Sequence, residues 1–298
     1  MEEKSNILKY KTLGIYTQNE NVVYMRKDCH VCISEGFEAL TRIRVSNMST
    51  SVIASLHIIT SDVLRQGEIG LSQIAAKKLK VSNGETLYVS HLEPIESLSF
   101  VRAKIYNQRL DYKAYKDIIT DIIEGDYSNI HLSAFITACA GDRMDLNEIS
   151  DLTKAMITSG KQLNWNKEIV VDKHCIGGLP GNRTTPIVVA IAAAYGLTMP
   201  KTSSRAITSP AGTADTMEVL TNVTLSGEEI KRVVEQEGGC LAWGGTAQLS
   251  PADDILIKVE KALDIDSEGQ LIASVLSKKA AAGSTHVVID IPVGETAK

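Results

Sequence analysis

Short apolar runs separated by turn-forming residues fill the first 92 positions of the chain. Branched residues predominate in these runs, as they do in strands that pack one face on a core. Four strands are predicted in this way, at 7–11, 22–25, 41–45 and 51–60. The pattern indicates a β-rich N-terminal unit.

One short helix and one tight turn interrupt the strands of this unit. Ser72 is a suitable N-cap for a helix over 73–79, and Asn83-Gly84 predicts a turn into a further strand. The stretch from Gly67 to Gly84 resembles one half of a double-psi β-barrel, a fold that often serves in docking or assembly. Residues 1–93 are therefore predicted to form a β-rich, double-psi barrel-like domain without catalytic residues.

A helical spacing of three to four residues replaces the strand pattern after position 94. One predicted helix carries its apolar face on Ala114, Tyr115, Ile118, Ile119, Ile122 and Ile123. A second helix begins near Asn129, and a third begins at Asp145 or Asn147 and ends at Gly160. His131 lies among apolar neighbours and is best interpreted as a core or helix-start histidine.

Strands and helices alternate from residue 168 onwards. The predicted order is a strand over 169–171, a helix over 185–195, a strand over 197–202, helices over 229–236 and 270–279, and a buried strand over 286–291. Such alternation is typical of an α/β sheet, which binds ligands at the carboxyl ends of its strands.

The predicted fold class is α/β and β, in three domains. These are a β-rich domain over 1–93, a helical domain over 94–166 plus about 245–276, and an α/β phosphate- or nucleotide-binding domain over 167–244 and 277–298, incomplete at its C-terminus.

Composition narrows the class of protein. The 298 residues are 44% hydrophobic and 22% charged, and the net charge of −5 argues against a nucleic-acid partner. No run of 18 apolar residues and no basic, apolar leader is present, so neither a membrane span nor a secretory signal is expected. The five cysteines are scattered and odd in number, which favours a reducing cytoplasm.

Cys29-His30-Val31-Cys32 has the spacing of half a zinc site. A second pair of ligands would have to come from elsewhere, and no second motif of this kind occurs. Two cysteines on a strand edge are the favoured interpretation, and no metal site is predicted.

A glycine-rich stretch from Asp172 to Thr185 lies between a predicted strand and a predicted helix. Glycines allow close approach of the backbone to a ligand, and the start of a helix offers free N–H groups to an anion. Lys173 and Arg183 add positive charge. The ATP-binding and dinucleotide-binding glycine patterns do not fit, so the alternatives are another kind of phosphate loop or a generic turn.

A second polar stretch runs from Lys201 to Asp215. Six hydroxyl groups and two cations fall between Lys201 and Thr213, with no acidic residue before Asp215. Hydroxyls and guanidinium donate the hydrogen bonds that phosphate and sugar oxygens accept. A polar surface loop is the alternative, and it fits less well because such loops usually include acidic residues.

These stretches resemble the thymidine phosphorylase family. The first motifs that carry the resemblance are Lys173-His174 with Gly177-Gly178, then Ser203-Ser204-Arg205, then residues 211–215. The wording of residues 201–209 is closer to the AMP phosphorylase branch, a type 2 thymidine phosphorylase-like subfamily. Later motifs that agree are 251–254, 272–274, 277–279, 283–286 and 289–294. The resemblance covers about 94–298 and, more weakly, the N-terminal barrel.

The resemblance implies roles for individual residues. Thr213 matches a phosphate-binding threonine, and Lys173 and Thr185 match further phosphate contacts. Asp266 matches the proposed proton donor, with a helix cap as its alternative role. The nucleotide- or phosphate-binding residues are Gly178, Ser203, Ser204, Arg205, Ala206, Ile207, Thr208 and Ser209, and those for the base or nucleotide are Ser274 and Lys298.

The chain departs from the family at several positions. Cys175 stands where the family usually has serine. Ile257 and Glu260 stand where the thymidine-specific branch places a tyrosine and an arginine, which puts specificity for thymine in doubt. The chain also stops at Lys298 in mid-motif, so we expect a C-terminally truncated member.

The expected activity is phosphorolysis of a nucleoside or nucleoside 5′-monophosphate, with inorganic phosphate as co-substrate and no metal or organic cofactor. The products are a free base and a pentose 1-phosphate or ribose 1,5-bisphosphate. The expected partners are these small molecules, not nucleic acid or membrane, and the resemblance implies a homo-oligomer. A non-catalytic nucleotide sensor on the same fold, or an assembly module built on the barrel, is the alternative.

Overall fold

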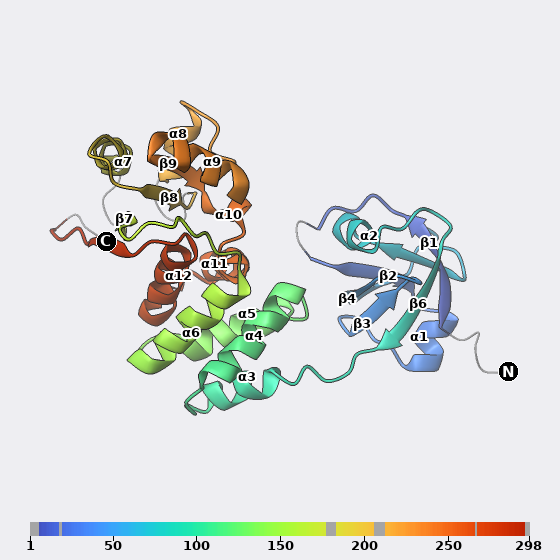
Figure 1. The fold of residues 1–298 in the computed structure, drawn as a ribbon. Coiled ribbons are helices and arrows are strands. Elements are labelled where there is room, and N and C mark those ends of the chain that lie inside the picture. The colour runs from blue at the N-terminus through green and yellow to red at the C-terminus, as the bar shows by residue number, and fades with distance from the viewer. Residues whose placement is uncertain (1–5, 18–19, 177–182, 206–211, 266, 296–298) are drawn as a thin grey trace. The chain divides into compact units, whose positions relative to one another are not determined.

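The computed structural model describes residues 6–17, 20–176, 183–205, 212–265 and 267–295. The chain divides into two compact units, residues 1–95 and residues 96–298, which Figure 1 draws in blue to teal and in green to red. Each unit has its own core and is described by itself.

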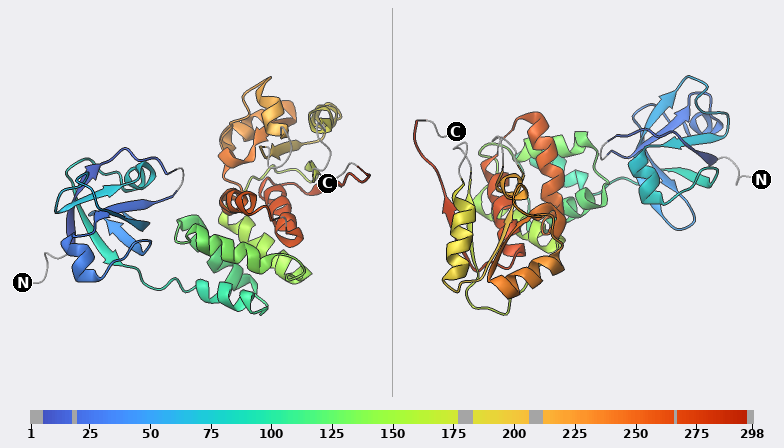
Figure 2. Two further views of the ribbon diagram at one scale, coloured as in Figure 1. Left: turned by 180° about the vertical axis from the view of Figure 1, so that it is seen from behind. Right: turned by 90° about the horizontal axis from the view of Figure 1, so that it is seen from above.

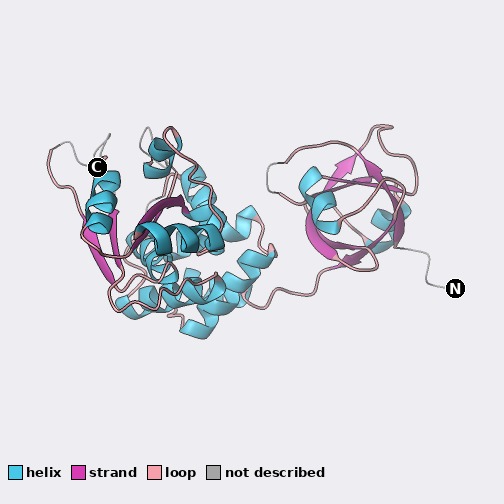
Figure 3. Ribbon diagram, turned by 45° about the horizontal axis from the view of Figure 1, so that its top comes forward, coloured by secondary structure: helices cyan, strands magenta, loops and turns pink. Residues whose placement is uncertain are grey.

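The first unit is a closed six-stranded barrel, with the strand order β1-β5-β2-β4-β3-β6. Figure 3 shows its strands as a ring. The four runs predicted as strands are confirmed, and β5 is an additional strand that pairs in parallel with β1. The elements are β1 (Ile7–Thr12), β2 (Val22–Arg26), α1 (His30–Glu35), β3 (Arg42–Ser46), β4 (Ser51–Ile59), β5 (Glu68–Leu71), α2 (Gln73–Leu79) and β6 (Thr86–His91).

One prediction for this unit was wrong. Cys29 and Cys32 do not lie on a strand edge, because Cys29 is the N-cap of α1, Cys32 lies within α1, and both are buried in the barrel core. Ser72 is the N-cap of α2, as predicted, although its side chain makes no hydrogen bond to the helix. Its hydroxyl donates to the Glu20 carbonyl and accepts from the Val22 amide, so it joins neighbouring segments of the barrel instead.

The second unit begins with a bundle of helices. Its first four are α3 (Leu98–Ile105), α4 (Tyr112–Glu124), α5 (Asn129–Cys139) and α6 (Leu146–Ser159). Two helices from much later in the chain, α11 (Pro251–Leu263) and α12 (Glu268–Ala281), pack against α4, α5 and α6 (Figure 2). His131 starts α5, as predicted, in a capping box with Ser128.

The rest of this unit is an α/β layer. Its elements are β7 (Val171–Cys175), α7 (Thr184–Ala194), β8 (Met199–Ser203), α8 (Thr213–Glu218), α9 (Gly227–Glu237), β9 (Gly239–Trp243), α10 (Gly244–Ala247) and β10 (His286–Asp290). β10 is parallel to β7, β8 is parallel to β9, and a parallel bridge between Val170 and Thr198 connects the two pairs. The carboxyl ends of these strands therefore point the same way.

β10 was predicted to be a buried strand, and this was wrong. Val287, Val288 and Ile289 are 37%, 65% and 39% exposed. Among the described residues β10 pairs on one side only, with β7, so its branched residues lie at an edge.

The segment after α6 fixes the α/β layer to the later helices. The Leu163 amide donates to the Ala281 carbonyl, and the Trp165 indole N–H donates to Ala282. Gly283 has φ of +79°, and a Cβ there would lie 2.5 Å from the Leu163 carbonyl oxygen. Only glycine fits this left-handed, closely packed position, so the approach of α12 to the sheet depends on it.

A stability test follows from the cap of α4. One Asp111 carboxylate oxygen accepts a hydrogen bond of 2.9 Å from the Ala114 amide. Asp111→Ala is expected to lower the free energy of unfolding by about 1 kcal/mol, because an N-terminal amide of the helix loses its partner. Asp111→Asn keeps an acceptor and should stay near the wild type. Chemical denaturation measures both, and equal loss in both variants would contradict the capping role.

Candidate functional site

A cavity of about 480 Å³ opens where β7, β8 and β9 end. It is lined by His174, Ser203 and Trp243 from the ends of these strands and by residues of α11 and α12. Parallel strands place ligands at this edge. The described residues that line it are His174, Thr202, Ser203, Ser204, Arg205, Trp243, Gly244, Gly245, Ser250, Asp254, Ile257, Lys258, Lys261, Lys278 and Lys279.

Positive charge predominates in the wall of the cavity. Lys258 and Lys261 lie three residues apart on α11 and are exposed, and Lys278 and Lys279 come from the last turns of α12. Only Asp254 among the lining residues is acidic. A cavity lined in this way favours an anionic ligand, because the low-dielectric walls focus the field of the lysines.

His174 lies in this field. Burial, followed by the charges of the neighbouring lysines, lowers the pKa of His174 to about 2. The imidazole is therefore neutral at physiological pH, so it offers one N–H donor and one nitrogen acceptor to a ligand.

Two carboxyl groups at the start of α11 differ in role. Asp253 is buried and forms an ion pair of 2.7 Å with Lys278, which holds that lysine at the cavity wall. Burial, and then the negative charge of Asp253, raise the pKa of Asp254 above its ordinary value. A carboxyl group with a raised pKa in a cavity is a candidate proton donor.

Arg205 is held by three partners. Its guanidinium lies 4.7 Å from the ring centroid of Trp243 and donates to both carboxylate oxygens of Glu218, at 2.6 and 2.7 Å. A third hydrogen bond of 3.1 Å reaches Asp215. The strong donors that the sequence assigns to a ligand are thus directed at carboxylates of this chain.

The structure brings some of the predicted site residues together. Ser203, Ser204 and Arg205 line the cavity. Ser274, half-buried on α12 one turn before Lys278, and Thr213, the first residue of α8, are not among the residues that line it.

Two other predicted phosphate contacts lie beside the cavity and do not line it. The Lys173 ammonium is 2.7 Å from an Asp290 carboxylate oxygen and donates to the Thr184 hydroxyl. Thr185 is buried in the first turn of α7. The predictions that lie outside the described residues are Gly178, Ala206, Ile207, Thr208, Ser209, Asp266 and Lys298.

The four lysines that line the cavity were not predicted as site residues from the sequence. Lys258 and Lys261 are spaced to share a helix face, and Lys278-Lys279 follow Ser274 by one turn. These spacings are visible in the sequence, but nothing in it tells which face of α11 or α12 meets the strand ends.

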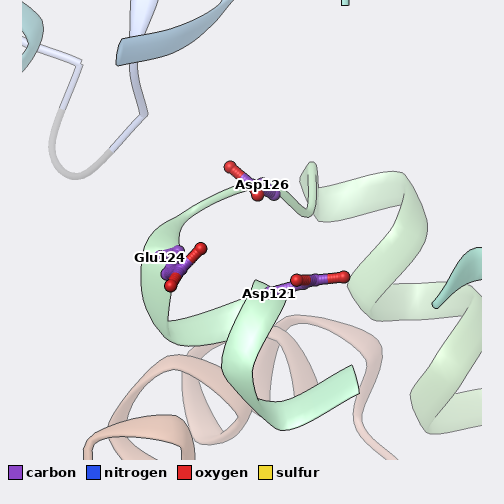
Figure 4. Close-up of side chains that lie close together, drawn as sticks. All are labelled: Asp121, Glu124 and Asp126. Carbon is purple, nitrogen blue, oxygen red and sulfur yellow. The ribbon is translucent and has the colours of Figure 1, made fainter. Parts of the chain in front are cut away.

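A group of carboxylates at the end of α4 is a separate feature (Figure 4). Carboxylate oxygens of Asp121, Glu124 and Asp126 lie within 4.8 Å of one another. Asp121 accepts a hydrogen bond from Ser97, and exposed acidic groups of this kind are common without an ion. No helix within the described residues has the length and apolar character to cross a membrane.

Family models match most of the second unit. Residues 98–160 match the helical bundle domain of a glycosyl transferase family, and residues 167–297 match its α/β domain.

Curated relatives agree with this assignment. A protein from Legionella pneumophila (strain Paris) named "Putative thymidine phosphorylase" is 58% identical over 297 residues, which is 100% of this chain and 57% of that protein. A protein of the same name from Hahella chejuensis is 56% identical, with 100% of this chain and 59% of that protein covered. The chain thus spans less than three fifths of the length of these relatives.

The fold is shared with a solved structure. Anthranilate phosphoribosyltransferase from Thermus thermophilus superimposes with a TM-score of 0.56, covering 65% of this chain and 59% of the other at 20% sequence identity. The helical bundle followed by an α/β layer is thus the arrangement of that enzyme.

Proposed function

Because the chain belongs to the glycosyl transferase family whose helical bundle and α/β domains it carries, we propose that it transfers a pentosyl group from a nucleoside 5′-monophosphate to inorganic phosphate. The products are a free base and ribose 1,5-bisphosphate. The names of the relatives support a phosphorylase, and the preference for a monophosphate over a nucleoside is our own proposal.

One observation carries the proposal: a cavity at the strand ends is lined by both lysines and hydroxyl groups. Lys278 and Lys279 come from α12, and Ser203 and Ser204 come from the end of β8 and the residue after it. Ammonium groups and hydroxyls are donors to phosphate oxygens, and hydroxyls also bind the hydroxyls of a sugar. The cavity volume of about 480 Å³ is in the range of a small-molecule site.

The chemistry requires alignment and a proton. A phosphate oxygen attacks the anomeric carbon as the bond from that carbon to the base nitrogen breaks, and the electron pair of this bond leaves with the base. Holding the reactants in line contributes up to about 7 to 11 kcal/mol. We propose Asp266, from its resemblance to the family's donor, as the acid that protonates the leaving base. Asp254, with its raised pKa, is the rival donor within the described residues.

Two positions on α11 bear on recognition of the base. Ile257 lines the cavity where the thymidine-specific branch places a tyrosine, and Glu260 replaces its arginine. A branched aliphatic side chain offers an apolar surface and no hydrogen bond to a base. The site is therefore proposed to accept its ligand through phosphate and ribose more than through specific contacts to thymine.

The deciding experiment is a screen with purified protein. Nucleosides and nucleoside 5′-monophosphates are incubated with phosphate, with arsenate, or with neither, and the free base is quantified. We expect base release only with phosphate or arsenate, because the attacking oxygen comes from the anion. Equal release without either anion would overturn the phosphorylase proposal, and tight binding without release would favour the nucleotide sensor.

A further inference from the structure

Three ionisable side chains form a buried group at the cavity. Lys201 on β8, Asp172 on β7 and Lys279 on α12 are each at most 3% exposed. The Asp172 carboxylate lies 3.5 Å from the Lys201 ammonium nitrogen and 2.9 Å from that of Lys279. Both lysines also donate to the Thr202 carbonyl, so their nitrogens share two acceptors.

This group has one carboxylate for two lysines. Lys173 and Lys278 nearby have carboxylates of their own, on Asp290 and Asp253. Two buried ammonium groups beside one carboxylate leave a positive charge without compensation, which is costly in a protein interior. The excess is relieved either by loss of a proton or by an anion close to the group.

The cavity is where such an anion would lie. Lys279 of this group and Thr202, whose carbonyl accepts from both lysines, line the cavity, whereas Lys201 and Asp172 do not. The Thr202 hydroxyl is buried and has no hydrogen-bond partner among the described residues. A donor without a partner and a surplus of cations therefore meet at the same part of the wall.

We infer that Lys201 is a positioning residue for the anion: it takes up a proton from solvent when a dianion binds beside Lys279, and thereby strengthens the binding. The only bond made is the third N–H bond of the Lys201 ammonium group. The identity of the anion, as phosphate or a phosphomonoester, rests on the proposed function. Its negative charge does not, because that follows from the lysines.

The surroundings of Lys201 favour the neutral amine over the ammonium form. Burial, and then the charge of Lys279, lower the pKa of Lys201 well below its ordinary value, against the opposing effect of Asp172. Titratable groups face it from three elements, namely Asp172 and His174 on β7, Lys279 on α12 and Cys240 on β9. Between Thr184 and Ala194, α7 has no charged residue, and α9 packs through its buried residues Ile230 and Val234.

The direction of the pH effect on folding follows. A lysine in the unfolded chain keeps its proton up to about pH 10.4, whereas folded Lys201 loses it at lower pH. Between these two values the unfolded state binds more protons, so stability rises with pH. Within this pH range the wild-type side chain is thus destabilising, and an apolar replacement of similar length should leave the protein as stable or make it more stable.

Sulfate is the probe, because it remains a dianion throughout the pH range used. Calorimetric titrations at neutral pH in two buffers of different ionisation enthalpy give the dissociation constant and the number of protons taken up. We compare the wild type with Lys201→Met and Lys201→Gln. Lys231→Met, at an exposed position on α9, is the control for the same loss of charge.

We expect proton uptake in the wild type and in the control, and none in either Lys201 variant. The dissociation constant for sulfate should rise about tenfold or more in these variants. This is the effect expected when one unit charge several ångströms from the anion is lost, at an effective dielectric constant of about 20. Their melting temperatures at neutral pH should equal or exceed that of the wild type.

Unchanged sulfate affinity and proton uptake in the Lys201 variants would overturn the inference, as would failure of the wild type to bind sulfate. Loss of the fold in both variants would also overturn it, since Lys201 would then be required for structure. Sulfate binding with the expected changes, but without phosphorolysis, would leave the inference standing and refute the proposed function. Phosphorolysis by the wild type, together with unaltered sulfate affinity in the Lys201 variants, would support the proposed function and refute the inference.

Discussion

Asp266→Asn is expected to lower kcat by about two to four orders of magnitude while KM changes little. General acid catalysis contributes an effect of this size. The amide has the shape of the carboxyl group but cannot transfer a proton to the departing base. Steady-state rates with a nucleoside 5′-monophosphate and saturating phosphate measure the change.

The alternative role of Asp266, as a helix cap, predicts a different result. The N-cap of α12 is Ser267, which is buried and donates to the Cys139 carbonyl. A cap variant would lower stability and leave kcat close to the wild type. Melting temperature measured beside kcat therefore separates the two roles.

Asp264→Asn is the matched control. Asp264 ends α11 in the left-handed conformation, with φ of +51°, which asparagine also adopts readily. The same chemical change two residues away should leave both kcat and stability near the wild type. If Asp266→Asn kept kcat within a few-fold at every pH while Asp254→Asn lost it, the donor would be Asp254.

Most of the fold could be predicted from local patterns in the sequence. Apolar runs and turn residues located the barrel strands, and capping residues such as Asp145 and Gly160 located the ends of α6. The prediction that β10 is buried was wrong because a run of branched residues looks the same in a central strand and in a strand that has a neighbour on one side only. The prediction that Cys29 and Cys32 lie on a strand edge was wrong because a helix of six residues is too short to show a helical period in the sequence.

The site was predicted in part, for a physical reason. Ser203, Ser204 and Arg205 follow a predicted strand, and the end of a parallel strand is a general place for a ligand. Lys258 and Lys278 come from helices that pack on the bundle through their other faces. Which face meets the strand ends depends on tertiary packing, and so does the pairing of Arg205 with Glu218.

Nucleoside 5′-monophosphates are expected to be better substrates than thymidine or uridine, with kcat/KM higher by about ten- to a hundredfold. A monophosphate brings a second dianion besides the attacking phosphate. We propose that the cavity binds two, because Lys278 and Lys279 form one pair of lysines on α12, while Lys258 and Lys261 form a second pair on α11. A charge-assisted hydrogen bond contributes about 1.5 to 3 kcal/mol, which gives the expected ratio.

The pair on α11 provides the test. Lys258→Ala combined with Lys261→Ala should lower kcat/KM for AMP, CMP and UMP about tenfold, and leave that for uridine almost unchanged, because uridine has no phosphate to bind. Lys113→Ala combined with Lys116→Ala, an exposed pair of the same spacing on α4, controls for the loss of two charges. A clear preference of the wild type for thymidine would assign the enzyme to the nucleoside-cleaving branch. An equal loss for uridine and UMP would mean that these lysines bind the attacking phosphate, since that anion is common to both reactions.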